Sequence, residues 1–509
     1  MSRVIDAIID HSRLAPNRIA AKDAVSEFTY SALIDEVARH ATGLYERGVD
    51  SGDRVAILMP NSVDFVVASL ACLWLGAIFV PLSPSDPEAR LKSIVDDCAP
   101  KFVIVRHEGA SAATDGSIGE VPLVSLRTIR SIGAEVSAVD DESRPCYIIY
   151  TSGTTGTPKG VLIGDAAFDA ALRSTVASLG LNRDTRALCV SPFHFDGSYG
   201  TLFATLYAGG SVYIRARDEL LFPRAFFNTI ESERITFTGF TPSYLRLLLS
   251  SPQISRLNES TLEVIALGGE AGAASDIIAL WSYAPKLRLF NRYGPTETTI
   301  AVTHASLSQG SVAEGTVSMG RPHPHVSFFL ADDGVMFDEV NRIGELYVGG
   351  VQLMDGYWGD WKLSEQVLRD DVVPGERVYR TGDLVYREAG GDYVYVNRAD
   401  RVVKRNGVRI SLIELDETVR GLPHVNAVAC LLFDDDGTPG IVAFVVTDGH
   451  VARDEVINGM MKRLPESMMP NPVEIIESLP MTNSNKLDER LLLSRVHLHP
   501  LRAPGLGTT

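Results

Sequence analysis

Short apolar runs alternate with helix-like stretches from residue 54 onwards, and this alternation limits the possible folds more than any other feature. Residues 54–59 (RVAILM), 77–82 (AIFVPL) and 101–106 (KFVIVR) have the apolar composition of buried strands. Residues 62–75 and 87–98, which lie between these runs, have a helical pattern. Strands that alternate with helices form βαβ units, so the pattern predicts a largely parallel, helix-covered sheet.

The pattern changes further along the chain. Residues 145–150 (PCYIIY) restart the alternation with a strand, whereas the runs VSFFLAD, GELYVGG and DYVYVNR, between 326 and 398, predict antiparallel strands joined by turns. After Asp400 the runs RVVKRNGVRI, HVNAVACLLFD and IVAFVVT predict a small α+β domain. Residues 107–144 are rich in Gly, Ser and Ala, and their composition indicates less order.

These changes divide a chain of 509 residues, which is too long for one hydrophobic core, into domains. We expect an α/β N-terminal domain over residues 1–399 and a small α+β C-terminal domain over residues 400–495. Residues 496–509 form a tail rich in Pro and Gly, which we expect to be disordered.

The net charge excludes several classes of partner. The formal charge of −17 opposes binding to nucleic acids and to anionic membranes. The five cysteines are scattered without a CxxC pair, which is typical of buried thiols in a reducing compartment. The N-terminus lacks a signal-peptide core, and the apolar segment 65–82 contains Gly76 and ends among prolines, which favours a buried helix leading into a strand over a membrane span. We therefore expect a cytoplasmic enzyme.

A phosphate-binding loop is predicted at residues 151–160 (TSGTTGTPKG). The stretch combines three glycines, several hydroxyl side chains and Lys159, a composition that we expect to form neither a helix nor a strand. Glycine lets the backbone wrap around an oxyanion, to which hydroxyl and amine groups donate. Pro158 stands where a Walker A loop needs glycine. A flexible surface turn is the alternative, but this density of donors after a buried strand favours phosphate contact.

With this loop and the stretches around it, the chain resembles the acyl-adenylate-forming enzymes, in particular the amino-acid adenylation enzymes of nonribosomal peptide synthesis. The resemblance covers almost the whole length and implies parallel sheets covered by helices, a β-barrel-like subdomain and a small, mobile C-terminal domain. The stretches are FTYSAL (28–33), LGAIFVPLSP (75–84), FHFDGSYG (193–200), LGGE (267–270), NRYGPTE (291–297), GELYVGGVQLMDGYW (344–358), YRTGDL (379–384), NRADRVVKRNGVRI (397–410), LPESMMP (464–470) and LPMTNSNKLD (479–488).

The family's first reaction explains several of these residue types. A carboxylate attacks the α-phosphate of ATP and expels pyrophosphate, so two anions meet while charge develops at phosphorus. By resemblance, Glu297 coordinates Mg²⁺ and Thr296 contacts the phosphate or the carboxylate. Lys486 matches a mobile lysine that bridges the substrate carboxylate and the α-phosphate, although Asn485 stands where the family usually has glycine.

The resemblance also implies a binding site for the rest of ATP. Tyr293 offers a ring face to adenine, Asp383 accepts hydrogen bonds from the ribose hydroxyls, and Arg398 assists there. The other ATP-binding residues implied are Thr151, Ser152, Gly153, Thr154, Thr155, Lys159, Gly269, Glu270, Asn291, Arg292, Gly294 and Tyr395.

The stretch FDGS carries the most information about the substrate. In amino-acid-activating relatives an Asp after an aromatic residue accepts the α-ammonium group, and Asp196 matches it; fatty-acyl and aryl-acid relatives generally lack it. Relatives that use β-amino acids often have the acid five residues upstream, where Ser191 stands. A buried Asp needs a charged partner, and the alternative is an Asp that caps a helix beginning near Gly197. Phe195 matches the aromatic gate near the carrier's pantetheine tunnel.

Arg292 has two interpretations in the substrate pocket that the resemblance implies. It either extends into the pocket and pairs with a carboxylate or carbonyl of the substrate side chain, or folds over a wall and leaves a small neutral pocket. Three glycines leave room there. The pocket positions are Phe195, Asp196, Gly197, Gly200, Gly239, Ile265, Leu267, Arg292, Ile300 and Ala301.

A second half-reaction is implied, in which the amino acid passes to the phosphopantetheine thiol of a carrier protein. Asp400 matches the hinge about which the small domain rotates. Lys404 and the Gly407 turn lie on the face that then approaches the thiol, and Lys404 joins Thr296, Glu297 and Lys486 as a catalytic residue. A local basic cluster either orients an acidic carrier or is a solvated face; it comprises Arg398, Arg401, Lys404, Arg405 and Arg409.

Too few residues follow LPMTNSNKLDERLLLSRV for a carrier domain, so we expect a freestanding ligase of secondary-metabolite biosynthesis with a separate carrier protein. Three alternatives remain open. They are a D-alanine–carrier protein ligase, an acyl-CoA ligase, against which Asp196 argues, and a non-catalytic adenylate-binding protein. The presence of Lys159, Glu297, Asp383, Arg398 and Lys486 argues against the last of these.

Overall fold

The predicted alternation of strands and helices is confirmed in a computed structural model of the chain. The described residues are 3–106, 116–133, 136–139, 144–151, 158–313, 317–398, 402–405, 407–435, 438–480 and 487–498. The first alternating elements are β3 (Arg54–Leu58), α3 (Val63–Leu75), β4 (Ile78–Leu82), α4 (Glu88–Cys98) and β5 (Val103–Val105). β3 pairs in parallel with both β4 and β5, as βαβ units require.

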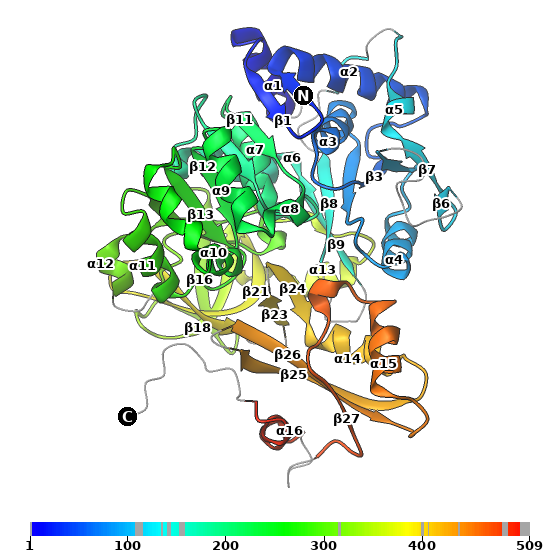
Figure 1. Cartoon of the computed structure of the whole chain (residues 1–509), viewed down its shortest axis with the longest axis vertical. Coiled ribbons are helices and arrows are strands. Elements are labelled where there is room, and N and C mark those ends of the chain that lie inside the picture. The colour runs from blue at the N-terminus through cyan, green and yellow to red at the C-terminus, as the bar shows by residue number, and fades with distance from the viewer. Residues whose placement is uncertain are drawn as a thin grey trace.

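Two eight-stranded sheets form the large domain, and Figure 1 shows most strands of the first in blue to cyan beside the mainly green strands of the second. The central neighbours in both sheets are parallel. The first sheet runs in the order β19 (Gly356–Tyr357), β9 (Lys159–Gly164), β8 (Pro145–Thr151), β4, β3, β5, β7 (Val121–Ser125), β6 (Ser117–Ile118). The second runs β15 (Thr303–Ser306), β14 (Arg288–Tyr293), β13 (Val264–Gly268), β12 (Phe237–Phe240), β10 (Arg186–Cys189), β11 (Ser211–Ile214), β1 (Ile19–Lys22), β2 (Glu27–Thr29).

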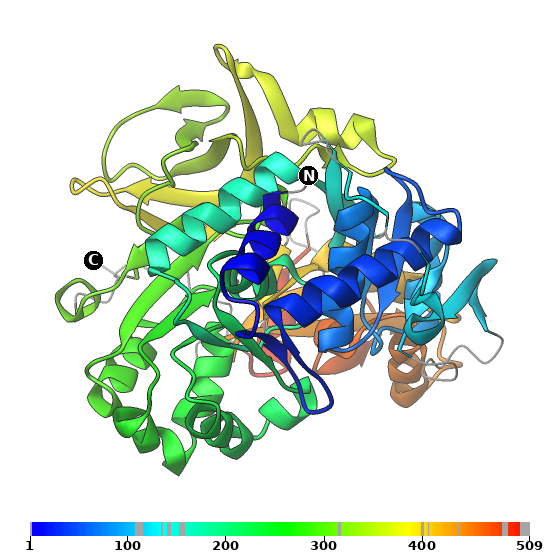
Figure 2. The same cartoon turned by 90° about the horizontal axis from the view of Figure 1, so that it is seen from above.

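Helices cover the two sheets, and the view from above shows α1, α2 and α6 lying across them (Figure 2). Their amphipathic character fits this position; in α1, for example, Val4, Ile5 and Ile8 are buried while the other face is polar. The helices of the large domain after α4 are α5 (Leu126–Ile129), α6 (Asp165–Leu179), α7 (Tyr199–Tyr207), α8 (Arg217–Leu220), α9 (Pro223–Ser232), α10 (Pro242–Leu249), α11 (Ala274–Tyr283), α12 (Gln309–Ala313) and α13 (Trp361–Val367); α1 (Arg3–Leu14) and α2 (Tyr30–Glu46) precede them.

The apolar segment 65–82 is a buried helix followed by a strand, as predicted. α3 begins where Ser62 caps it by accepting a hydrogen bond from the backbone N–H of Phe65, and it ends at Gly76 in the left-handed conformation (φ 73°). Its residues are buried on all sides because α3 packs inside the large domain. Within the described part of the chain, no helix is both long and apolar enough to span a bilayer.

Two expectations about the first sheet were wrong. Residues 151–160 do not lie wholly outside regular structure, because Thr151 ends β8 and pairs with Lys159, the first residue of the antiparallel strand β9. Composition also missed β6, β7 and α5 within residues 107–144. The short run VPLVS forms β7 because it pairs in parallel with β5 at the sheet edge. The five cysteines are free and buried, as expected.

The antiparallel strands predicted between 326 and 398 form a separate six-stranded sheet, the barrel-like subdomain. It runs β17 (Val335–Phe337), β16 (Val326–Asp332), β18 (Gly344–Gly350), β21 (Glu376–Arg387), β20 (Leu368–Val373), and β22 (Tyr393–Arg398) also pairs with β21. Its core includes Tyr293, the last residue of β14, and Val302, which directly precedes β15, so the subdomain closes against the second sheet.

The C-terminal part is an α+β unit with a core of its own, drawn in orange and red below both large sheets in Figure 1. Its elements are β23 (Val402–Arg405), β24 (Val408–Ser411), α14 (Leu412–Arg420), β25 (Val425–Asp435), β26 (Thr438–Thr447), α15 (Arg453–Met461), β27 (Val473–Ile476) and α16 (Glu489–Arg495). The predicted fold class is therefore confirmed. The domain boundaries stay predictions, because residues 399–401 and 499–509 lie outside the described residues.

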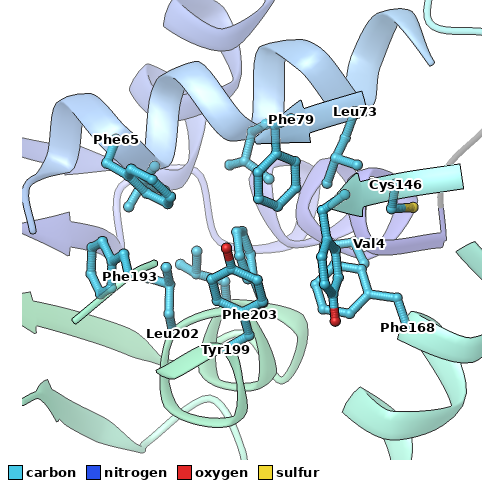
Figure 3. Packing of buried hydrophobic residues seen from close by; sticks show 14 of the residues in the cluster. Val4, Phe65, Leu73, Phe79, Cys146, Phe168, Phe193, Tyr199, Leu202 and Phe203 are labelled. Atoms are coloured by element: carbon cyan, nitrogen blue, oxygen red, sulfur yellow. The ribbon is translucent and has the colours of Figure 1, made fainter. Parts of the chain in front are cut away.

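Aromatic side chains fill the space where the two large sheets meet, as Figure 3 shows for Phe79, Phe168, Tyr199 and Phe203. Phe79 comes from β4 of the first sheet, whereas Tyr199 and Phe203 come from α7, which packs on β10 and β11 of the second. Ring centroids lie 5.0 Å apart for Tyr199 and Phe203 and 5.5 Å apart for Phe168 and Phe203, in edge-to-face geometry.

We expect Phe203→Ala to destabilise the large domain, because truncating a fully buried phenylalanine leaves a cavity that costs about 3–5 kcal/mol. The measurement is the thermal unfolding midpoint of the purified chain. Phe222→Ala is the matched control, since the Phe222 side chain is 69% exposed and its loss should leave the midpoint almost unchanged. Equal midpoints for the two variants would contradict the role assigned to the aromatic cluster.

Candidate active site

A cavity of about 680 Å³ opens between the two large sheets and the C-terminal domain. Its walls are the end of β8 and the segments that follow β4, β10, β12, β13 and β14, together with Arg405, Gly407, Val408 and residues 465–468 from the C-terminal domain. Ligands of α/β proteins bind at the carboxyl ends of parallel strands, so this is the place where the fold provides a site.

The structure brings together many of the residues predicted from the sequence. Those that line the cavity are Thr151, Phe195, Asp196, Gly197, Gly269, Arg292, Gly294, Thr296, Ile300 and Arg398. Other predicted residues do not line it: Lys159, Gly200, Gly239, Ile265, Leu267, Glu270, Asn291, Tyr293, Glu297, Ala301, Asp383 and Tyr395. The positions Ser152, Gly153, Thr154, Thr155, Asp400 and Lys486, and the side chain of Lys404, lie outside the described residues.

Asp196 is a buried carboxylate in the cavity wall. It begins a short 3₁₀ turn (Asp196–Ser198), but it is not the helix cap, because Phe195 is the N-cap residue there. Instead Asp196 Oδ2 accepts a hydrogen bond from the Ile300 backbone N–H at 3.2 Å, and Oδ1 accepts one from Thr296 Oγ1 at 3.3 Å. Burial, helped by the negative charge of Glu297, raises the pKa of Asp196 to about 6.

The backbone N–H of Ile300, which donates to Asp196, belongs to a strained turn. Thr299 and Ile300 have φ values of 59° and 67°, a left-handed conformation that is unfavourable for β-branched residues. The buried amide of Gln352 holds this turn, since its Nε2 donates to the carbonyl oxygens of Thr299 and Ala301 at 3.2 and 2.8 Å. Thr299 Oγ1 donates in return to the Gln352 carbonyl oxygen at 2.8 Å.

Arg292 extends into the space between α7 and β12 and lines the cavity. A Cβ atom at Gly200 would lie 2.6 Å from Arg292 Nη1, and one at Gly239 would lie 3.0 Å from Nη2. The guanidinium therefore occupies room that these two glycines provide. At Gly197, by contrast, a Cβ atom would meet nothing within 4 Å. Burial lowers the pKa of Arg292 to about 10, so the group keeps its positive charge at neutral pH.

The predicted ribose site is a tight cluster beside the cavity. Arg398 Nη1 donates to Asp383 Oδ1 at 2.7 Å, and Tyr293 Oη donates to Oδ2 at 2.5 Å. Asp383 and Arg398 pair across β21 and β22, which explains why they meet. Asp383 thus already has partners. Of the three residues Tyr293, Asp383 and Arg398, only Arg398 lines the cavity. Asn291 lies behind the wall, where its amide donates to the Ser318 carbonyl oxygen at 2.8 Å.

Glu297, the predicted Mg²⁺ ligand, follows Thr296 in the sequence and is fully buried. Tyr357 Oη donates to Glu297 Oε1 at 2.7 Å, and the ammonium of Lys159 lies 5.7 Å from the centroid of the Tyr357 ring. The described residues contain no group of three or more His, Cys, Asp or Glu side chains that could hold a metal. One carboxylate fits an Mg²⁺ ion that nucleotide phosphates supply with most of its ligands.

The C-terminal domain presents the Gly407 turn to the cavity. Glu270 Oε1 accepts a hydrogen bond from the Gly407 backbone N–H at 2.7 Å, while its Oε2 accepts one from Ser243 Oγ. Gly269, which adjoins this turn, has a φ of 87°, a conformation that favours glycine. Phe195 packs against the hydrophobic core of the C-terminal domain from the other side. Glu270 is thus a contact between the domains in this arrangement.

A buried ion pair between the domains was not predicted from the sequence. Arg90 Nη1 of α4 lies 3.2 Å from Glu414 Oε1 of α14, and Arg90 Nε lies 3.5 Å from Asp86 Oδ2. Burial raises the pKa of Glu414 to about 7, and Arg90 opposes this rise. The two partners are 324 positions apart in the chain, so no local pattern could have revealed the pair.

Two side chains of the predicted basic cluster, Arg398 and Arg405, lie within the described residues, and both have partners inside the protein. Arg398 is buried against Asp383, and Arg405 Nη2 donates to the carbonyl oxygens of Ser467 and Met469 at 2.6 and 2.8 Å. These two guanidinium groups therefore point into the protein rather than toward a partner. Arg401 and the side chains of Lys404 and Arg409 lie outside the described residues.

We expect Arg90→Gln to weaken docking of the C-terminal domain by about 3 kcal/mol, because it leaves Glu414 buried without its counter-charge. The measurement is the radius of gyration by small-angle X-ray scattering, which should increase. The double variant with Glu414→Gln should bring the radius back toward the wild-type value, since it removes both charges of this pair and leaves only Asp86 without its partner. Arg256→Gln is the control, because its partner Glu231 lies within the large domain. An unchanged radius for Arg90→Gln would contradict this role.

Comparisons with known proteins agree with this fold and cavity. A family model described as AMP-binding enzyme matches residues 10–358. The "Dimodular nonribosomal peptide synthase" of Bacillus subtilis (strain 168) is 32% identical over 488 residues, which cover 94% of this chain. The chain spans only 20% of the length of that relative.

Two solved structures show the same fold. A double mutant of o-succinylbenzoate CoA synthetase from Bacillus subtilis has a TM-score of 0.84 and 22% identity, with 96% of this chain and 98% of that chain covered. An NRPS protein containing adenylation and PCP domains has a TM-score of 0.86 and 23% identity, with coverages of 97% and 84%. At this level of identity the similarity concerns the fold alone.

Proposed function

Because this chain belongs to the AMP-binding enzyme family, we propose that it activates an α-amino acid with ATP and passes the aminoacyl group to a carrier protein. In the first step a carboxylate oxygen of the amino acid attacks the α-phosphorus of ATP. The bond from phosphorus to the bridging oxygen of pyrophosphate breaks, so that aminoacyl-AMP and pyrophosphate are the products. The second step is attack of the phosphopantetheine thiol on the acyl carbon, with release of AMP.

The observation that carries this proposal is the buried carboxylate of Asp196 in the cavity wall. Its two hydrogen bonds come from neutral donors, Thr296 and Ile300, so its negative charge is not neutralised by them. A substrate ammonium group would supply the missing positive charge, and burial would make that interaction strong. A fatty acid brings no such group, and its binding would leave the buried charge uncompensated.

Several residues of the chain would act on the phosphates. Thr151 and Thr296 present hydroxyl groups to the cavity, and Lys159 would add a positive charge beside them. Mg²⁺, when bound, would neutralise charge on the phosphates, and Glu297 would be its protein ligand. The cluster of Tyr293, Asp383 and Arg398 would take the nucleoside, with Asp383 exchanging one of its present partners for the ribose.

The position of the Gly407 turn supports the second step. The turn lies at the cavity, held by Glu270, so the C-terminal domain faces the site with the side for which the family resemblance implies thiol transfer. Lys486 would take this place in the first step, after rotation about Asp400. We infer a separate carrier protein as the acceptor; a solved protein of the same fold contains adenylation and PCP domains.

We expect the purified chain to catalyse exchange of labelled pyrophosphate into ATP in the presence of one or a few α-amino acids. Asp196→Asn should reduce kcat/KM for the amino acid by about 100-fold, the effect of losing a buried charge-assisted contact. The KM for ATP should change little, which serves as the internal control.

Exchange with fatty or aryl acids alone would refute the amino-acid proposal. Exchange with no acid at all would favour a non-catalytic adenylate-binding protein. The acceptor is tested separately, by comparing thioester formation on a phosphopantetheine-bearing carrier with that on coenzyme A; transfer to coenzyme A only would indicate an acyl-CoA ligase instead.

We expect kcat/KM for the amino acid to fall as the pH drops below about 6. The pKa of Asp196 is raised to about 6, and only the ionised carboxylate can bind an ammonium group, so substrate binding is complete above this pH and is lost below it. The measurement is the pH profile of pyrophosphate exchange at limiting amino acid. An inflection near the ordinary pKa of an aspartate, about 4, would contradict the assignment.

A further inference from the structure

Arg292 carries hydrogen-bond donors that have no partner among the described residues. Its side chain is more than nine-tenths buried, yet Nε and Nη1 make no hydrogen bond there. The negative charge of Asp196 acts against the effect of burial on the pKa of Arg292, but the described residues place no carboxylate within ion-pair distance of the guanidinium. An unpaired buried charge is costly, and folded proteins keep one where a ligand completes it.

A chain of hydrogen-bonded side chains, Gln352, His323 and His304, determines which ring nitrogens of the two histidines carry a proton. The Gln352 amide nitrogen donates to backbone carbonyls, so Gln352 Oε1 is the atom that faces His323 Nδ1 at 3.0 Å. His323 Nδ1 is therefore protonated, and its Nε2 accepts a hydrogen bond from His304 Nδ1 at 2.6 Å. Burial lowers the pKa of both histidines, which keeps them neutral.

This assignment leaves His304 Nε2 as a lone-pair acceptor. That atom is buried and has no hydrogen-bond partner among the residues that the structure describes. His304 stands directly opposite Arg292 in the antiparallel pair of β14 and β15, so both side chains lie on the same face of the sheet. Because His304 is neutral, it does not neutralise the charge of Arg292, which stays available to a ligand.

We propose that Arg292 binds the second carboxylate of the substrate, and hence that the substrate is a dicarboxylic amino acid such as aspartate or glutamate. The inference rests on the proposed function. Asp196 takes the ammonium group, Arg292 takes one carboxylate, and the other carboxylate attacks the α-phosphorus. The ammonium group and the side-chain carboxylate of such a substrate then each meet an opposite charge of the pocket, and the guanidinium can bind that carboxylate through two parallel hydrogen bonds.

Gly200 and Gly239 are part of this arrangement. They accommodate the guanidinium, so the space they provide is filled by the protein and not by a bulky substrate side chain. A large apolar substrate side chain would contact the guanidinium without offering it a counter-charge or a hydrogen-bond acceptor. A neutral amide such as asparagine matches aspartate in shape and differs only in charge, which makes the acid–amide pair the sharpest probe of Arg292.

The test is pyrophosphate exchange by the full chain with aspartate, glutamate, asparagine, glutamine and alanine. We expect one of the two acids to exceed its own amide by at least about 100-fold in kcat/KM, because a site built for a charged group rejects an analogue that leaves it unpaired. Arg292→Ala should abolish this preference, and Arg292→Lys should retain part of it, since lysine keeps the charge but not the planar fork.

Gly200→Ala provides an independent variant, because its methyl group would collide with Nη1 and should lower the preference for the acid while the KM for ATP stays the same. Thermal unfolding midpoints show whether each variant is folded. Equal exchange with acid and amide by the wild type, or an acid preference that survives in folded Arg292→Ala, would overturn the inference and leave the proposed function intact. Exchange with none of the amino acids, these or others, would overturn both.

Discussion

The packing of aromatic side chains between the two large sheets is the contact on which the site depends. It fixes α7 against both sheets, and the short turn that carries Asp196 leads directly into this helix. The same packing turns the carboxyl ends of both sets of parallel strands toward one cavity. The residues around the cavity come from distant parts of the chain, so the distances between them depend on this contact between the two sheets.

Within that rigid frame the protein maintains features that oppose stability. A buried aspartate, a buried arginine that the described residues do not pair, and two consecutive left-handed residues lie together in one wall. Each costs free energy that the surrounding packing must offset. Gln352 connects them, because its amide holds the strained turn next to Asp196 and also begins the chain of side chains that ends beside Arg292. Such a concentration of unfavourable groups is characteristic of a site prepared for a ligand.

Much of the fold could be predicted because it depends on local patterns. The alternation of strands and helices and the later antiparallel runs follow from residue spacing, and the short stretches around Asp196 and Thr296 pointed to one site. The chain of Gln352, His323 and His304 could not be found in this way, since these residues are ordinary polar side chains until the sheet brings them together. The same holds for Arg90 and Glu414. Regular structure within residues 107–144 was missed because pairing with β5, not composition, decides it.

Gly200 and Gly239, the two glycines beside Arg292, determine the order in which substitutions in this pocket could occur during evolution. A larger residue at position 200 meets the guanidinium, and one at position 239 meets Thr201 Oγ1 as well as the guanidinium, so neither change is accommodated while Arg292 keeps its present place. Replacement of Arg292 by a small residue would have to come first, and only then could new side chains fill the space. Descendants with a different selectivity should therefore share an intermediate that lacked the arginine, and reversal would become harder with each later substitution at the glycines.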